Sequence, residues 1–261
     1  MLNNINAQSQ WLGAMKALVK STELQVQPPL LKLGRMQEIY LAANSHLYTS
    51  SQILHIDKQL QAVQFRYKST SLTLEQLWAL SMTLQLRSID IVEKQTDVNL
   101  WQDEEMTIGL TVLESFLFHA RSFLDMYMLY ICLIFGMEKP VLMSTSDFKK
   151  FKKSITQPAL QLKAEYIWSY FDNSVLADNA WGDTLRSLRD KITHKEPLRP
   201  SQKEDISLVG RELIWPVIRK LPFSDIAQEF KNGIFETLRD TAPVLFDLEW
   251  KVGPYKPDLW K

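Results

Sequence analysis

Residues 103–135 read DEEMTIGLTVLESFLFHARSFLDMYMLYICLIF, and this stretch decides the fold. Large apolar side chains recur through it at the three- and four-residue spacing of an α-helix. Glu104 and Glu105 stand at its start, where acidic side chains interact favourably with the helix dipole, and Gly136 follows as a stop. We therefore expect one long central helix, with other helices packed around it.

The flanking sequence is also rich in helix-forming residues. Only 8 of the 261 residues are glycine, so the chain lacks the Gly-rich turns that punctuate β-proteins. Residues 51–68 partly alternate as a strand would, but Ile53, Ile56 and Leu60 follow helical spacing, and we favour a helix there. Spacing, caps and prolines predict further helices beginning at residues 30 and 158 and over residues 5–20, 73–94, 146–153, 180–192, 202–220 and 224–247. The predicted fold class is therefore all-α.

Three regions are expected along the chain. Residues 1–100 form a helical N-terminal accessory region, and residues 104–245 form a helical bundle around the central helix. Residues 246–261 contain Gly253-Pro254 and Pro257, which exclude regular helix, so this end of the chain is predicted to be an extended arm.

Composition indicates a cytoplasmic protein without a membrane partner. Lys and Arg together number 30, as do Asp and Glu, so no global basic field points to nucleic acid or lipid. The first residues lack a basic start followed by an apolar core, and the run Met126–Phe135 is about half the length needed to cross a bilayer. Cys132, the single cysteine, lies in that run and is expected to be a small buried hydrophobe in a reducing compartment.

Familiar catalytic and cofactor motifs are missing from the sequence. It contains neither GxxxxGK nor GxGxxG, which removes the main support for phosphate-loop and dinucleotide-binding proteins. HExxH and GxSxG are missing as well, which argues against zinc hydrolases and serine hydrolases. We therefore expect no cofactor and no metal.

One segment carries recognisable chemistry. Residues 189–194 read Arg-Asp-Lys-Ile-Thr-His, an arginine followed by a polar residue and, after four intervening residues, by a histidine. This RxxxxH arrangement resembles the HEPN superfamily, whose catalytic members carry arginine, four to six residues, then histidine. Residues 114–125 are also similar to the first core helix of that family, and the resemblance covers residues 104–245. It implies an all-α bundle and a metal-independent endoribonuclease, in which two protomers join their motifs in one composite cleft.

The residue types of the motif suit RNA cleavage. Histidine titrates near neutral pH and can exchange a proton with the ribose 2′-hydroxyl, while arginine offers a positive fork to the phosphate. On a straight helix, residues five apart are separated by about 140° around the axis, so Arg189 and His194 do not share one face. A helix end before Pro197 is therefore expected to let His194 turn relative to Arg189. The resemblance implies a second device, in which two protomers bring their motifs together.

Secondary roles are predicted for the neighbouring charged and polar side chains. Asp190 is expected to orient the arginine or the histidine. Arg121 and Asp125 are interpreted first as an i,i+4 ion pair, and second as part of the cleft together with Glu114. RNA-phosphate contacts are predicted for Lys191, Thr193 and Lys195.

Several alternatives remain open on the sequence alone. The Arg189–His194 pair also fits an exposed helix end, in which case the bundle is a non-catalytic module that binds a protein or a nucleotide. The lysines at 149, 150, 152 and 153 suit either a solvated amphipathic helix or an RNA-contact patch. The resemblance further suggests a toxin or antiviral-defence effector, with RNA as its partner, a homodimer as its active form and a separate inhibitory or regulatory protein.

Overall fold

The computed structural model describes residues 29–94, 104–138, 145–194, 207–209, 212–214, 217–218 and 221–248. Helices dominate these residues, and the predicted all-α class is confirmed. A helix over residues 29–44 leads into the short 3-10 turn η1 (Ser45–Leu47). The longer elements are α2 (Ser50–Lys94), α3 (Glu104–Ile134), α4 (Thr145–Lys152), α5 (Pro158–Tyr170), α6 (Trp181–His194) and α7 (Phe223–Phe246).

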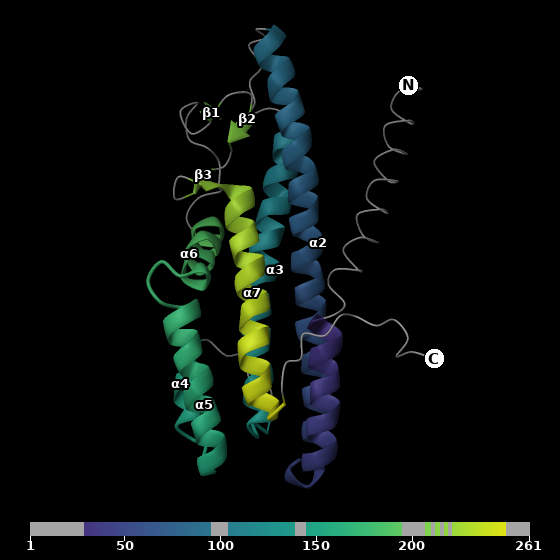
Figure 1. Cartoon of the computed structure of the whole chain (residues 1–261), viewed down its shortest axis with the longest axis vertical. Helices are drawn as coiled ribbons and strands as arrows, with labels where there is room; N and C mark the ends of the chain where they lie inside the picture. Colours follow the sequence, from purple (N-terminus) through teal and green to yellow (C-terminus); the bar gives the residue numbers. More distant parts are fainter. Residues whose placement is uncertain are drawn as a thin grey trace, which may run out of the picture.

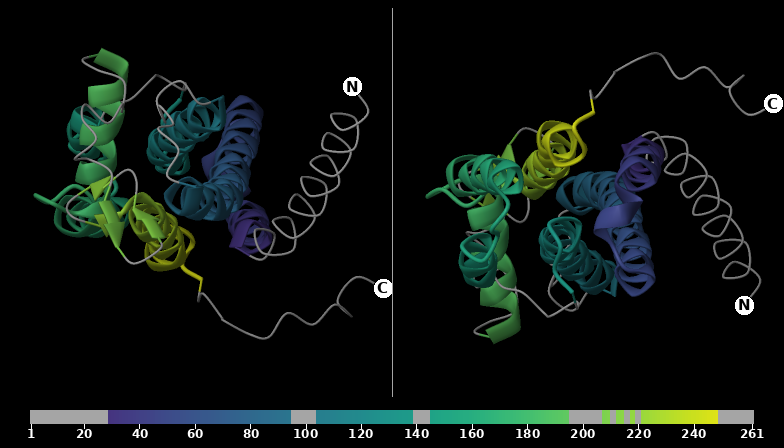
Figure 2. Two further views of the ribbon diagram at one scale, coloured as in Figure 1. Left: turned by 90° about the horizontal axis from the view of Figure 1, so that it is seen from above. Right: turned by 90° about the horizontal axis from the view of Figure 1, so that it is seen from below.

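The long helices run side by side in an elongated bundle (Figure 1). The helix over residues 29–44 descends and α2 returns beside it, after which α3 and α7 both descend again. α2 packs along α3, and α7 contacts both of them. α4 and α5 form a pair at one side, whereas α6 lies across the bundle rather than along it, as the end views show (Figure 2).

α3 is the central helix that the sequence predicts. Most of its side chains from Phe123 to Phe135 are buried, and Cys132 is fully enclosed, which confirms its expected role as a small hydrophobe. Gly136 ends the helix with φ +94°, a backbone conformation that favours glycine. Although Thr111–Ile134 is long and apolar enough to cross a membrane, 67% of its apolar window is buried inside the bundle, as in the core helix of a soluble protein.

A single core joins the N-terminal helices to the rest of the bundle. Leu33, Ile56 and Val63 belong to the same buried cluster as residues of α3, α6 and α7. Polar links inside this core fix the register of the helices. The hydroxyl of Tyr130 donates to Gln37 at 2.6 Å, and Gln37 donates in turn to Asp57 at 2.7 Å.

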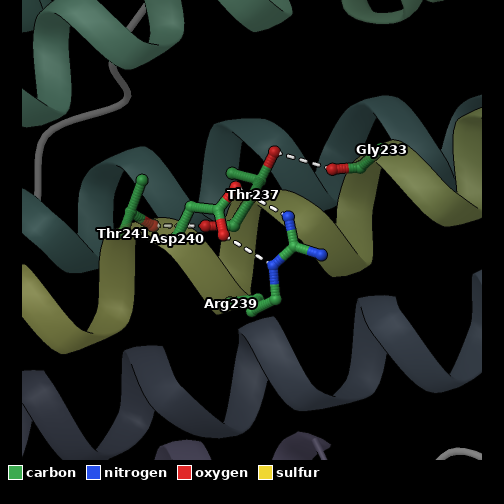
Figure 3. Close-up of polar contacts among 5 residues, drawn as sticks. All are labelled: Gly233, Thr237, Arg239, Asp240 and Thr241. Atoms are coloured by element: carbon green, nitrogen blue, oxygen red, sulfur yellow. Dashed lines mark hydrogen bonds and ion pairs between the residues drawn. The ribbon is translucent and has the colours of Figure 1, made fainter. Parts of the chain in front are cut away.

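The buried side of α7 carries two threonines whose hydroxyls bond backward along their own helix (Figure 3). Thr237 donates to the carbonyl of Gly233 at 2.8 Å, and Thr241 donates to the carbonyl of Thr237. The hydroxyl of Thr241 also lies 2.8 Å from the hydroxyl of Tyr127 on α3. Arg239, which is partly buried, donates two hydrogen bonds to its neighbour Asp240.

Three expectations need correction. The helix predicted over 202–220 is wrong at the described residues, which form two antiparallel strand pairs: β1 (Ser207–Val209) with β2 (Glu212–Ile214), and β3 (Val217–Ile218) with β4 (Leu221–Pro222). Gly210-Arg211 is a two-residue hairpin signal, and Pro216 cannot continue a helix.

The other two corrections concern helix ends. The helices predicted over 51–68 and 73–94 form one continuous helix, α2, because Thr70 and Thr73 bond back to carbonyls within it instead of capping a new helix. The sequence Asp172-Asn173 also predicts a turn after the helix that begins at residue 158, but Phe171–Val175 form a π-helical turn that extends α5. The predicted helix over 5–20 and the C-terminal arm beyond residue 248 lie outside the described residues.

Candidate functional site

α6 carries the RxxxxH motif and is held by its apolar face. Trp181, Leu185 and Leu188 recur at helical spacing and are buried against α3 and α7. Gly233 of α7 allows the close approach of Trp181, since a Cβ built there would lie 2.4 Å from the indole ring. This contact fixes the start of α6, so the motif near its end has a defined position relative to α3.

The motif occupies the last turns of α6. Nη1 of Arg189 donates to Oδ1 of Asp190 at 3.0 Å, and both side chains are partly exposed. Lys191 is exposed. His194 is the last residue of the helix, so regular helix separates its backbone from that of Arg189 by about 140° around the axis. The side chains of Thr193 and His194, and Lys195 as a whole, lie outside the described residues.

α3 places a second ion pair beside this one. Nη2 of Arg121 lies 3.0 Å from Oδ1 of Asp125, so the predicted i,i+4 pair is formed. The Arg121 side chain is only 14% exposed, and its Nη1 is buried without a hydrogen-bond partner in the part of the chain that the structure describes. A buried guanidinium N–H without an acceptor is costly, and Arg121 therefore holds a donor that the described residues do not use.

The electrostatics of Asp125 place α6 and α3 at one site. Burial raises the pKa of Asp125, and the positive charges of Arg121 and Arg189 oppose that rise, while Asp190 adds to it. Two charged side chains from each helix therefore act on one another. Arg121, Asp125, Arg189 and Asp190 are called the α3–α6 charge cluster below.

Glu114 is the least engaged of the predicted cleft residues. It is half-buried on α3, seven residues before Arg121 and therefore close to the same face of the helix. No ion pair joins it to another residue that the structure describes. The geometry thus brings Arg121 and Asp125 to the motif, whereas Glu114 stands two turns away.

The sequence did not reveal the partner of His119. Nη1 of Arg66 on α2 lies 3.0 Å from Nδ1 of His119 on α3. Burial lowers the pKa of His119, and the positive charge of Arg66 lowers it further. The two residues are 53 positions apart, so no local spacing signals this contact.

The lysines of α4 are engaged with neighbouring side chains. Lys152 lies 2.5 Å from Glu165, and Lys149 and Lys152 both stand over the ring of Trp168. Phe148 is buried and stacks on the same tryptophan. This arrangement favours the amphipathic-helix interpretation of α4 over an RNA-contact patch.

Neither a metal-binding group nor a similar protein gives further information on this site. Among the described residues, no group of three or more His, Cys, Asp or Glu side chains is placed to hold a metal ion. Comparison with protein-family models, with curated proteins and with solved structures finds no match.

Proposed function

We propose that this protein is a metal-independent endoribonuclease that acts as a homodimer. The observation that carries the proposal is the α3–α6 charge cluster, in which Arg121 and Asp125 lie beside Arg189 and Asp190 on the helix that ends at His194. Two guanidinium groups at one place suit a phosphodiester, and a histidine at the adjoining helix end suits proton transfer.

The proposed reaction uses the RNA's own nucleophile. The 2′-hydroxyl oxygen attacks the adjacent phosphorus while a base, His194, takes its proton. The bond from phosphorus to the 5′ oxygen breaks, and that oxygen takes a proton from an acid, a second histidine. The products are a 2′,3′-cyclic phosphate and a 5′-hydroxyl. Arg189 and the free N–H of Arg121 stabilise the charge that builds on the phosphate oxygens.

The acid is proposed to be His194 of a second protomer. On the regular helix α6, the backbone positions of Arg189 and His194 differ by about 140° around the axis, so we infer that one chain presents the two residues in different directions. When two copies of α6 meet, the arginine of one chain comes near the histidine of the other, and two histidines serve as base and acid. The active form is therefore proposed to be the dimer, with RNA bound across it.

One observation favours a second candidate, a non-catalytic binding module. The α3–α6 charge cluster contains two arginines and two aspartates, so its formal charge is zero and its attraction for phosphate is reduced. A module of this kind uses the same face to bind a protein or a nucleotide. Biological roles as a cytoplasmic toxin or defence effector under a regulatory protein rest on the motif resemblance alone.

RNA cleavage by matched variants tests the proposal. Purified wild-type protein, His194→Ala and Arg189→Ala are incubated with labelled RNA in EDTA, beside His46→Ala and Arg186→Gln as controls. His46 is exposed on η1, and Arg186 lies one turn before Arg189 on α6, paired with Asp183. Cleavage by the wild type and the two controls, lost in the two motif variants, supports the enzyme.

Product chemistry and dimer mass complete the test. A 2′,3′-cyclic phosphate is lighter than a linear phosphate by one water, which mass spectrometry resolves. Wild-type protein that is folded and dimeric but leaves RNA intact contradicts the enzyme and favours the binding module.

A further inference from the structure

A cluster of exposed aromatic and basic side chains lies where α2 meets α3. It consists of Phe65 and Arg66 on α2 and of Phe118 and His119 on α3, and is called the Phe–Arg cluster below. Phe65 is 60% exposed and Phe118 is 49% exposed, although phenylalanine is usually buried. Two exposed rings at one place on a bundle with a large aromatic core call for a functional explanation.

The arginine stands between the two rings. Its guanidinium carbon lies 5.5 Å from the ring centre of Phe65 and 5.3 Å from that of Phe118. Both distances are within the range of cation–π attraction. Arg66 forms no ion pair with any carboxylate among the described residues, so its charge is not neutralised locally.

The contact with His119 determines where the imidazole proton resides. A guanidinium can only donate, so Nδ1 of His119 accepts the hydrogen bond from Arg66. The neutral imidazole therefore carries its proton on Nε2, which is a donor. The edge of the His119 ring contacts Phe118, with centroids 5.6 Å apart. The cluster thus combines two ring faces, a guanidinium and an imidazole N–H.

The positive charge near the cluster comes from α2. On α2, the residues that share the side of Arg66 include His55, Lys58, Ala62 and Ser69. On α3, Thr111, Ser115 and Ser122 share the side of Phe118 and His119. Glu114 and Asp125 also lie within about 40° of Phe118 around the helix axis, so α3 contributes acidic side chains as well. The positive charge that attracts a phosphate therefore lies on the α2 side of the cluster, at Lys58 and Arg66.

We propose that the Phe–Arg cluster binds an unpaired base of single-stranded RNA together with an adjoining phosphate. The base stacks on the exposed ring of Phe65 or Phe118, while Arg66 and the Nε2–H of His119 bind the phosphate or the base edge. This inference rests on the proposed function and adds a substrate subsite to it. A second copy of the chain fits this face less well, because it would set Lys58 and Arg66 against like charges.

Binding is measured with the full chain carrying His194→Ala, which prevents cleavage during the measurement. Fluorescence anisotropy follows a labelled single-stranded RNA of about twelve nucleotides and the same strand in a duplex. Phe65→Leu, Phe118→Leu and Arg66→Gln are introduced one at a time. Tyr166→Leu on α5, 51% exposed, is the control for loss of an exposed aromatic ring, and Lys68→Gln on α2 is the control for loss of a charge.

The expected result is weaker binding of the single strand, by about tenfold for each cluster variant, with both controls like the parent. Duplex RNA is expected to bind more weakly than the single strand, because its bases are not available to stack. Equal single-strand affinity for the parent and all three cluster variants overturns the proposal, as does a parent that does not bind. A cluster variant that instead changes the dimer mass assigns the face to self-association and overturns it too.

The same variants in the wild-type background separate this inference from the proposed function. A cleaving enzyme is expected to show a higher KM for the single strand in Phe118→Leu, with an unchanged kcat. If the wild type binds RNA through the cluster but never cleaves it, the proposed nuclease activity is contradicted and the RNA-binding subsite is supported. If the wild type cleaves RNA and Phe118→Leu leaves both the affinity and the KM unchanged, the RNA-binding subsite is contradicted and the nuclease activity is supported.

Discussion

The indole of Trp181 lies so close to Gly233 that a Cβ added to the glycine would be 2.4 Å from ring atoms Cδ2 and Cε2. Gly233→Ala therefore forces α6 and α7 apart and is expected to lower the free energy of unfolding by about 1–3 kcal/mol. Gly34→Ala is the matched control: its Cβ meets Gln64 at 3.6 Å, and helix propensity predicts a gain of about 0.5–1 kcal/mol. Urea denaturation compares the two, and equal stability of both variants would contradict the close contact.

Tyr127 and Thr241 test the buried polar link between α3 and α7. Their hydroxyls are 2.8 Å apart in the core, and Thr241 is fully buried. Thr241→Val leaves the tyrosine hydroxyl without this partner and is expected to cost about 1–3 kcal/mol. Adding Tyr127→Phe removes the orphaned hydroxyl, so the double variant is expected to be more stable than the sum of the two single losses predicts. Strictly additive losses in thermal or urea unfolding would show that the hydroxyls do not interact.

Local patterns explain what the sequence predicted well. The central helix follows from unbroken apolar spacing up to Gly136, and the Arg121–Asp125 pair follows from i,i+4 geometry. These features depend on residues close together in the chain. The strand pairs within 207–222 are not predicted, because a run of apolar residues suits either a helix or a strand.

The candidate site is only partly predictable, because its residues lie far apart in the chain. The RxxxxH spacing is local, but the meeting of Arg189 with Asp125 depends on how α6 crosses α3. The Arg66–His119 contact and the exposure of Phe65 likewise depend on how α2 aligns with α3. Helix pairing is set by side-chain packing across the whole bundle, and no short stretch of sequence encodes it.

His119 is expected to make the stability depend on pH. Its pKa in the folded protein is lowered below the ordinary value of 6.5 by burial and by Arg66. Below pH 6.5 the unfolded chain therefore binds more protons than the folded one, and stability falls as the pH drops toward the folded pKa. His119→Gln removes this contribution, so wild-type protein should lose more stability than the variant between pH 7.5 and about 5.5. Parallel pH profiles for the two proteins in urea denaturation would contradict the prediction.

Arg121→Met tests the α3 half of the charge cluster. Methionine keeps the packing of the stem but leaves Asp125 without its nearest cation, so the pKa of Asp125 should rise further. A loss on the order of 1 kcal/mol is expected at pH 7. Because a raised pKa makes the folded state bind more protons, the loss should shrink as the pH falls through that raised pKa toward 3.8. The exposed Arg35–Glu38 pair provides the control, since Arg35→Met should cost about 0.5 kcal/mol or less.

Subunit mixing tests whether the cleft is composite. Arg189→Ala and His194→Ala dimers are each expected to be inactive. When the two are unfolded together and refolded, about half of the dimers should contain one chain of each kind if pairing is random. Such a dimer keeps the histidine of one chain as the base and the arginine of the other, and water replaces the missing histidine as the acid. A composite cleft therefore regains part of its cleavage, whereas a site within one chain regains none. Mixing Arg189→Ala with the double variant Arg189→Ala, His194→Ala is the control, because those dimers contain no Arg189. Recovery in the first mixture and not in the second supports a cleft built across two protomers. No recovery in either, with mixed dimers verified by mass, would contradict a cleft that works with the arginine of one chain and the single histidine of the other.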